Sequence, residues 1–207
     1  MIVQTSSNVQ FLKTLSARPF TRRIVIHHSA SKPETTVEDI HRWHLARGWS
    51  GIGYHYYIDG SGVVWEGRPE WTQGAHAYQD PQHEANTDGI GICLGGNFEI
   101  GPGPTEEQLD SLASLIADIG TRYQDIPVIG HKDVQSTACP GKYFSWTGLQ
   151  ARLERSTPTP APPDWKEGVI ARAMSDQLLT EYHDPEQLTP LWMVLAIIYN
   201  GKEKGVL

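Results

Sequence analysis

Two histidines and a cysteine in this sequence are of the types that could together bind a metal ion. His131 and Cys139 lie eight residues apart in a segment with little regular periodicity, and a histidine doublet, His27 and His28, lies far upstream. Two imidazoles and one thiolate are borderline-soft donors, and three protein ligands with an open fourth position are typical of catalytic zinc. A structural zinc normally has four protein ligands, so this set indicates hydrolysis.

The doublet lies in a segment, 23–29, that is predicted to form a buried strand. Side chains alternate between the two faces of a strand, so His27 and His28 point in opposite directions and only one can share a site with His131. Spacing alone leaves open which one it is. Residues 127–129 are predicted to form a last short strand that leads into the loop carrying His131.

The other patterns before residue 156 predict a mixed α/β domain with helices packed on a central sheet. Thr36 and Asp39 form a candidate capping box that opens a helix, and Thr105 and Gln108 form another at the start of the clearest helix, 105–123. The remaining predicted elements are the strands 54–59, 63–66 and 90–94, of which the first two form a hairpin, and a closing helix over 146–153.

A proline-rich stretch divides the chain of 207 residues. Residues 156–163 contain four prolines, which cannot continue a helix and favour an extended spacer. We therefore expect a catalytic domain over 1–155, a linker over 156–163 and a small helical C-terminal region over 164–207. A region of this size rarely folds alone, so we expect it to pack on the first domain or to form a homodimer through its helices.

The composition excludes several classes of partner. A formal net charge of −7 argues against nucleic acid, whose binding depends on clustered lysine and arginine. No stretch approaches the roughly 18 uninterrupted apolar residues of a membrane span, and the N-terminus lacks the pattern of a secretory signal peptide. We therefore expect the protein to be cytoplasmic when made. Cys93 and Cys139 are the only cysteines, so no disulfide framework is expected, and Cys93 is interpreted as a small buried hydrophobe.

Six short motifs follow one another in the order of a known family. They are V-I-H-H-S-A at 25–30, R-W-H at 42–44 with G-W at 48–49, G-Y-H-Y-Y-I at 53–58, G-A-H-A at 74–77, I-G-I-C-L-G-G-N-F at 90–98, and G-H at 130–131 with A-C-P-G at 138–141. Together they resemble the zinc-dependent N-acetylmuramoyl-L-alanine amidases of type 2, which include phage amidase lysozymes and peptidoglycan recognition proteins. The resemblance covers roughly residues 22 to 153 and implies the same α/β fold.

The resemblance implies a role for each residue of the candidate site. It makes His27, His131 and Cys139 the ligands of one zinc ion per chain and leaves His28 as a packed neighbour. It makes Tyr54 the active-site tyrosine, whose phenol can donate to, or exchange a proton with, the attacking oxygen and the developing oxyanion.

Two further positions follow from the same resemblance. His76 matches the position that contacts substrate near the scissile amide. Thr137 stands where phage amidase lysozymes carry a catalytic lysine, and recognition proteins with amidase activity also have threonine there. A hydroxyl can hydrogen-bond an oxyanion but brings no positive charge, so we expect Thr137 to be a weaker electrostatic helper.

The implied activity is peptidoglycan hydrolysis. Zinc-activated water is expected to cleave the amide bond between the lactyl group of N-acetylmuramic acid and the L-alanine of the stem peptide. We expect a phage or prophage endolysin that acts on the cell wall after release. The alternatives are a non-catalytic peptidoglycan-binding module and a bacterial autolysin or recycling amidase. For the C-terminal region, wall binding is an alternative to packing or dimerisation.

Overall fold

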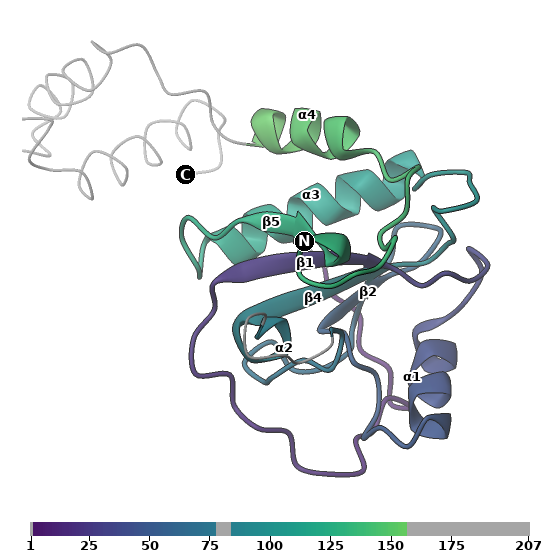
Figure 1. Cartoon of the computed structure of the whole chain (residues 1–207), viewed down its shortest axis with the longest axis vertical. Helices are drawn as coiled ribbons and strands as arrows, with labels where there is room; N and C mark the ends of the chain where they lie inside the picture. The colour runs from purple at the N-terminus through teal and green to yellow at the C-terminus, as the bar shows by residue number, and fades with distance from the viewer. Residues whose placement is uncertain (1, 78–83, 157–207) are drawn as a thin grey trace, which may run out of the picture. The chain divides into compact units, whose positions relative to one another are not determined.

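The computed structural model describes residues 2–77 and 84–156, which form a mixed sheet flanked by helices (Figure 1). The strands are β1 (Arg23–His28), β2 (Tyr56–Ile58), β3 (Val64–Glu66), β4 (Gly89–Leu94) and β5 (Val128–Gly130). The helices in this part of the chain are α1 (Val37–Ala46), α2 (Ala85–Asp88), α3 (Glu106–Gly120) and α4 (Trp146–Ser156), with a 3-10 turn, η1 (His131–Asp133). The predicted fold class is confirmed.

The predicted linker, 156–163, and the C-terminal region, 164–207, lie outside the described residues apart from Ser156. The linker, the helical region and dimerisation therefore remain predictions. Ser156 is the last residue of α4, so this helix continues beyond its predicted end and one residue into the predicted linker. In the described part of the chain, no helix has the length and apolarity needed to cross a membrane.

The order of the strands places the ends of β1 and β5 side by side. The sheet runs β3-β2-β4-β1-β5. β1 is parallel to both β4 and β5, β2 is parallel to β4, and β3 pairs antiparallel with β2 as the predicted hairpin. Ligands of open α/β sheets bind at the carboxyl ends of the strands, so this edge is where a site is expected.

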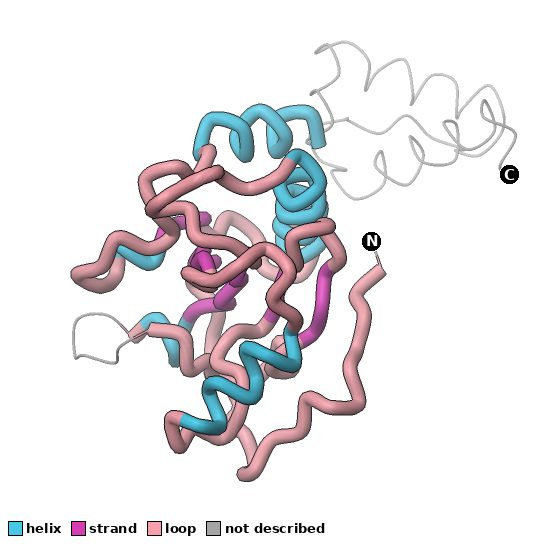
Figure 2. Tube along the Cα trace, turned by 90° about the vertical axis from the view of Figure 1, so that its right-hand side faces the viewer, coloured by secondary structure: helices cyan, strands magenta, loops and turns pink. Residues whose placement is uncertain are grey.

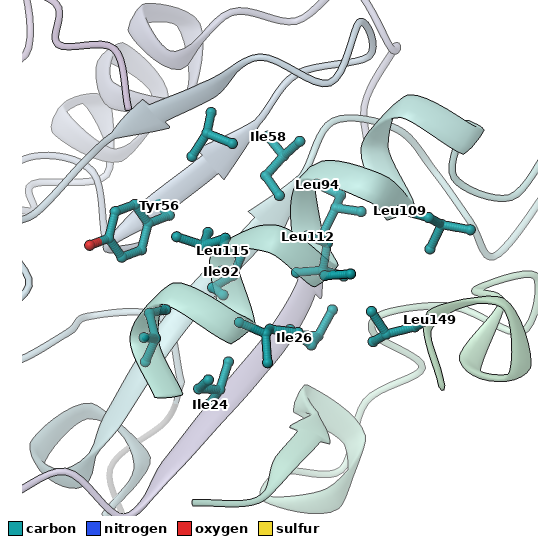
Figure 3. Close-up of a cluster of buried hydrophobic side chains, with 14 of the residues drawn as sticks. Ile24, Ile26, Tyr56, Ile58, Ile92, Leu94, Leu109, Leu112, Leu115 and Leu149 are labelled. Atoms are coloured by element: carbon teal, nitrogen blue, oxygen red, sulfur yellow. The ribbon is translucent and has the colours of Figure 1, made fainter. Parts of the chain in front are cut away.

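One face of the sheet carries the main hydrophobic core, under α3 and α4 (Figure 3). Ile24 and Ile26 point to this face from β1, and Ile92 and Leu94 do so from β4, as the alternation of a strand requires. From the helices, Leu109, Leu112, Leu115 and Leu149 complete the core. Fully burying a side chain of this kind contributes about 1.5–3 kcal/mol to stability, so this face anchors the sheet.

The opposite face of the sheet is covered by α1 and the segment that follows it. In Figure 2 the strands lie between α1 and the pair of helices α3 and α4. Val37 and Ile40 of α1 pack with Ile52, Tyr57 and Cys93 in a second, smaller core. Toward β1, Val25 packs with Ala85 and Val134 in a third small cluster, and the polar side chains described below lie on the same face.

Two of the helices begin at the capping boxes that the sequence predicts. The Thr36 hydroxyl accepts the Asp39 N–H at 3.2 Å, and the Thr105 hydroxyl accepts the Gln108 N–H at 3.1 Å. α3 ends at Gly120, three residues before its predicted end. α2 and η1 were not predicted, because helices of three or four residues are too short to show an amphipathic period.

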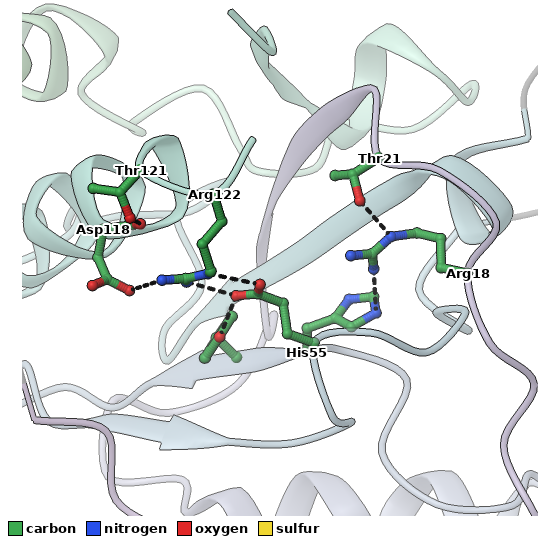
Figure 4. Close-up of polar contacts among 8 residues, drawn as sticks. Arg18, Thr21, His55, Asp118, Thr121 and Arg122 are labelled. Carbon is green, nitrogen blue, oxygen red and sulfur yellow. Dashed lines mark hydrogen bonds and ion pairs between the residues drawn. The ribbon is translucent and has the colours of Figure 1, made fainter. Parts of the chain in front are cut away.

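An ion-pair network connects the end of α3 to the segment after β3. Arg122 forms a bidentate pair with Glu70, at 3.0 and 2.8 Å, and a further pair with Asp118 at 2.8 Å (Figure 4). The Tyr56 hydroxyl donates to the same Glu70 carboxylate at 2.6 Å. Bidentate geometry makes this the kind of surface pair that contributes to stability.

Candidate metal centre and catalytic site

Three side chains that are far apart in the sequence meet at the carboxyl edge of the sheet. The ligand atoms of His27, His131 and Cys139 all lie within 4.8 Å of one another. His27 is the next-to-last residue of β1, and His131 directly follows β5, which pairs with β1. The structure therefore brings together the three residues predicted to bind zinc.

The histidine doublet is resolved by the register of the sheet. His27 is paired with Cys93 of β4, so its side chain lies on the face of the smaller core. His28 points to the other face, where its Nδ1 accepts the Phe98 N–H at 3.0 Å and its ring packs against the ring of Phe98. His28 is thus a packed neighbour of the site, as predicted.

The loop that carries His131 and Cys139 is held by hydrogen bonds that involve its backbone and its side chains. Asp133 Oδ2 accepts the Gly130 N–H at 2.7 Å, and the Lys132 N–H donates to the Cys139 carbonyl at 2.8 Å. The His28 N–H also donates to Cys139 Sγ at 3.4 Å. The position of the thiol is therefore set both by its own loop and by the end of β1.

The chemistry of the three donors fits a zinc ion. Burial, followed by the neighbouring His76 and His131 rings, holds the pKa of His27 well below its usual range, and burial also lowers the pKa of His131. Both rings are therefore neutral, which is the form that binds metals. Burial raises the pKa of the Cys139 thiol to about 11, and a bound cation would favour its thiolate. Within the described ranges no fourth histidine, cysteine or carboxylate joins this group, which leaves a position for water or substrate.

A pocket of about 610 Å³ opens beside the three candidate ligands. Its walls come from the end of α1 and the residues after it, from the segment before α2, and from the ligand loop. The residues that line it are His44, Arg47, Trp49, Tyr54, Ala75, His76, Ala77, Asn86, His131 and Gln135. This volume is within the range of small-molecule and peptide side-chain pockets.

Tyr54 lies in this pocket next to the candidate ligands. The centroid of its ring is 5.1 Å from that of His27 and 5.6 Å from that of His44. Burial, with the Cys93 and Cys139 thiols nearby, raises the pKa of the Tyr54 phenol well above its usual value. The phenol is therefore protonated at neutral pH and is a hydrogen-bond donor, and it interacts with the nearby Cys93 thiol.

The other two predicted site residues occupy different environments. His76 is buried and lines the pocket, and its Nδ1 lies 3.0 Å from Nε2 of His27. Thr137 is exposed, and its hydroxyl oxygen accepts the Cys139 N–H at 3.3 Å. The hydroxyl proton of Thr137 takes no part in that bond, so it is available for donation to another group. The predicted contact with an oxyanion stays a prediction.

The sequence analysis missed three buried histidines that hold neighbouring segments together and one residue, Gln135, that contacts a candidate ligand. Three buried histidines accept backbone N–H groups of the neighbouring segments through Nδ1: His41 from Ile52 at 3.1 Å, His44 from Gly53 at 3.0 Å, and His55 from Gly91 at 2.9 Å. No pattern in the sequence marks these bonds, since each partner is 9 to 36 residues away. Gln135, which bonds His131 at 2.8 Å, lies four residues after it, and that spacing was a usable signal.

These neutral histidines predict that the fold is sensitive to acid. Burial lowers the pKa of His44 to about 4 and that of His55, which lies beside Arg18 (Figure 4), to about 3. Below pH 6.5 the unfolded chain binds protons at these two positions and the folded chain does not. The contribution of the two neutral histidines to the free energy of unfolding is therefore fully present above pH 6.5 and is lost as the pH falls toward 4. For His44 alone the loss between pH 7.5 and 4.5 is about 2.5 kcal/mol.

His44→Asn tests this, because the amide oxygen can still accept the Gly53 N–H while the titrating ring is removed. Urea unfolding at pH 7.5 and 4.5 is expected to show a difference in unfolding free energy that is about 2.5 kcal/mol smaller for this variant than for the wild type. An equal difference for both proteins would contradict the assignment.

The fold and the site together define a class of protein: an α/β domain with an open site of two histidines and a cysteine, as expected of a metal-dependent hydrolase. A family model described as N-acetylmuramoyl-L-alanine amidase matches residues 16–142, and the chain belongs to this family. The predicted family, and with it an endolysin-like amidase that hydrolyses peptidoglycan, is confirmed.

Known relatives come from phages, bacteria and insects. The endolysin of Enterobacteria phage T3 is 35% identical over 129 residues, which cover 59% of this chain and 82% of the phage protein. A peptidoglycan-recognition protein of Drosophila melanogaster is 34% identical over 130 residues, or 58% of this chain and 68% of the insect protein. Among solved structures, the N-acetylmuramoyl-L-alanine amidase LysC from Clostridium intestinale superposes with a TM-score of 0.67 at 34% identity, covering 74% of this chain and 98% of that one.

Proposed function

We propose that this protein is a zinc-dependent amidase of the endolysin type, which separates the stem peptide from the glycan at the bond between the lactyl group and L-alanine. The observation that carries the proposal is the convergence of His27, His131 and Cys139 beside an open pocket. We infer the reaction from the family to which the chain belongs. We infer zinc from the two imidazoles and one thiol, which are typical ligands of catalytic zinc.

Each described residue of the site has a place in this reaction. His27, His131 and Cys139 would hold the zinc ion. When bound, zinc would polarise the amide carbonyl and lower the pKa of a water molecule to about 7. The protonated Tyr54 donates a hydrogen bond to the carbonyl oxygen as that atom gains negative charge, and the Thr137 hydroxyl is the second candidate donor.

The walls of the pocket orient the substrate. Trp49 offers an aromatic surface, and the Arg47 guanidinium lies 5.8 Å from the centroid of that ring. A cation and an aromatic ring at the rim suit a stem peptide that carries carboxylates. Water adds across the C–N bond of the bound amide, which leaves a lactyl carboxylate on the glycan and a free amino group on L-alanine.

The proposal is tested by the products formed from purified peptidoglycan. We expect the zinc-loaded protein to release new L-alanine amino termini without new reducing sugars. A chelator should stop the release, and added zinc should restore it. New reducing sugars would indicate cleavage of the glycan instead. A folded protein that binds zinc and sediments with peptidoglycan but releases no amino termini would indicate the binding module.

A further inference from the structure

The buried His76 contacts the candidate metal centre through one of its ligands. Its Nδ1 is 3.0 Å from Nε2 of His27, and the two rings meet edge to face with 5.0 Å between their centroids. The other ring nitrogen of His27, Nδ1, lies 3.8 Å from Cys139 Sγ. His27 therefore has one nitrogen on the side of the candidate ligands and the other on His76.

Metal binding through Nδ1 would select one tautomer of His27. A neutral imidazole carries one ring proton, and the nitrogen without it offers the lone pair. Nδ1 can serve as a ligand beside Cys139 only when the proton is on Nε2, and that N–H then donates to Nδ1 of His76. We propose that His76 is a positioning residue, which fixes the tautomer and the orientation of His27 for metal binding. This inference rests on the zinc site proposed above.

The second candidate histidine ligand shows the same pattern. Nε2 of His131 lies 2.8 Å from Oε1 of Gln135, an oxygen that can only accept a hydrogen bond. With an oxygen at this position, the proton of His131 would be on Nε2 and the lone pair on Nδ1 would face the metal centre. Both histidines thus direct Nε2–H to an acceptor, and in the case of His27 that acceptor is His76.

Two glycines make the space in which the ring of His76 lies. A Cβ atom on Gly91 would lie 2.4 Å from Cδ2 of His76, and one on Gly74 would also lie 2.4 Å from it. Gly91 is two residues before Cys93 on β4 and shares its face, which is the face of His27. The His76 N–H donates to Asn86 Oδ1 at 2.7 Å, so the backbone is held as well.

If His76 accepts from His27, its own proton is on Nε2. That atom is buried and has no hydrogen bond of normal geometry among the residues that the structure describes, although the Gly89 backbone raises the pKa of the ring. Within the described residues, the contact with His27 is therefore the one hydrogen bond of normal geometry that the His76 ring makes.

The test measures zinc affinity in the full-length protein by competition with a chromophoric chelator. His76→Leu fills the space but has no acceptor, and we expect it to raise the Kd for zinc about 10- to 100-fold. His76→Asn places an amide oxygen near the position of Nδ1 and should restore most of the affinity. The absorption spectrum of the Co2+-loaded protein reports ligand geometry, and it should change in His76→Leu and return toward that of the wild type in His76→Asn.

A second variant keeps the imidazole and moves it. Gly91→Ala crowds the ring of His76, and it should also weaken zinc binding. If circular dichroism shows that His76→Leu is unfolded, the zinc Kd of Gly91→Ala tests the positioning role of His76 instead. His41→Asn is the matched control, since His41 is a buried histidine whose Nδ1 accepts the Ile52 N–H described above, and its zinc Kd should equal that of the wild type.

Two results would overturn the proposal, and they differ in what else they reject. If His76→Leu and Gly91→Ala bind zinc as tightly as the wild type while the KM for peptidoglycan rises, His76 contacts substrate and does not position His27. If the wild type itself binds no stoichiometric zinc, the metal site and the role of His76 fail together.

Discussion

Replacing Cys139 by serine is expected to lower the rate of amide cleavage by about 1000-fold or more. A serine hydroxyl keeps its proton at neutral pH and is a poor zinc ligand, so two histidines alone would hold the metal. A catalytic metal contributes several kcal/mol of transition-state stabilisation, and each 1.36 kcal/mol is a factor of ten in rate. The measurement is release of L-alanine amino termini, together with bound zinc per chain by atomic absorption.

The other cysteine provides a matched control. Cys93 is completely buried, lies opposite His27 in the sheet and is not one of the three converging donors. Cys93→Ser is expected to keep one zinc per chain. If Cys139→Ser also kept its zinc and its turnover, the metal site would have to be abandoned, although the amidase family would still stand.

Removing the hydroxyl of Tyr54 is expected to lower kcat by about 100-fold or more while zinc binding is unchanged. A single donor aimed at a developing oxyanion is worth about 10²- to 10³-fold in kcat. Tyr54→Phe keeps the ring that packs near His27 and His44, so the pocket should keep its shape. Single-turnover rates with a soluble muropeptide separate this effect from substrate binding.

The outcome of this experiment distinguishes a chemical role from a packing role. A loss in kcat with KM and zinc stoichiometry unchanged assigns the phenol to the transition state. A variant with wild-type turnover would show that Tyr54 only packs in the wall of the pocket. Tyr56→Phe is the control for loss of a tyrosine hydroxyl, since that hydroxyl bonds Glu70 in the network with Arg122.

Local signals in the sequence determined most of the secondary structure. The capping boxes at Thr36 and Thr105 depend on contacts three residues apart, so the start of each helix could be predicted before the fold was known. The apolar runs in 23–29 and 90–94 likewise predicted buried strands, and the alternation of side chains along a strand placed His27 and His28 on opposite faces. The linker and the C-terminal region were also predicted from local composition, and they lie outside the described residues.

The choice between the two histidines of the doublet required the tertiary structure. They are the last two residues of β1, and the packing of α3 and α4 on one face places the pocket on the other, where His27 lies. The motifs in family order pointed to His27, but the physical reason lies in the pairing of β1 with β4 and β5.

The sequence alone thus determined the family and the order of the main elements and predicted the candidate ligands, because these depend on residue identity and on neighbours within a few positions. The tertiary structure decided how the candidate ligands are supported. His76 meets His27 across 49 positions of the chain, and the glycines that make room for its ring have no side chain to produce a pattern. Contacts of this kind depend on how separate segments pack together, and packing is a property of the folded chain.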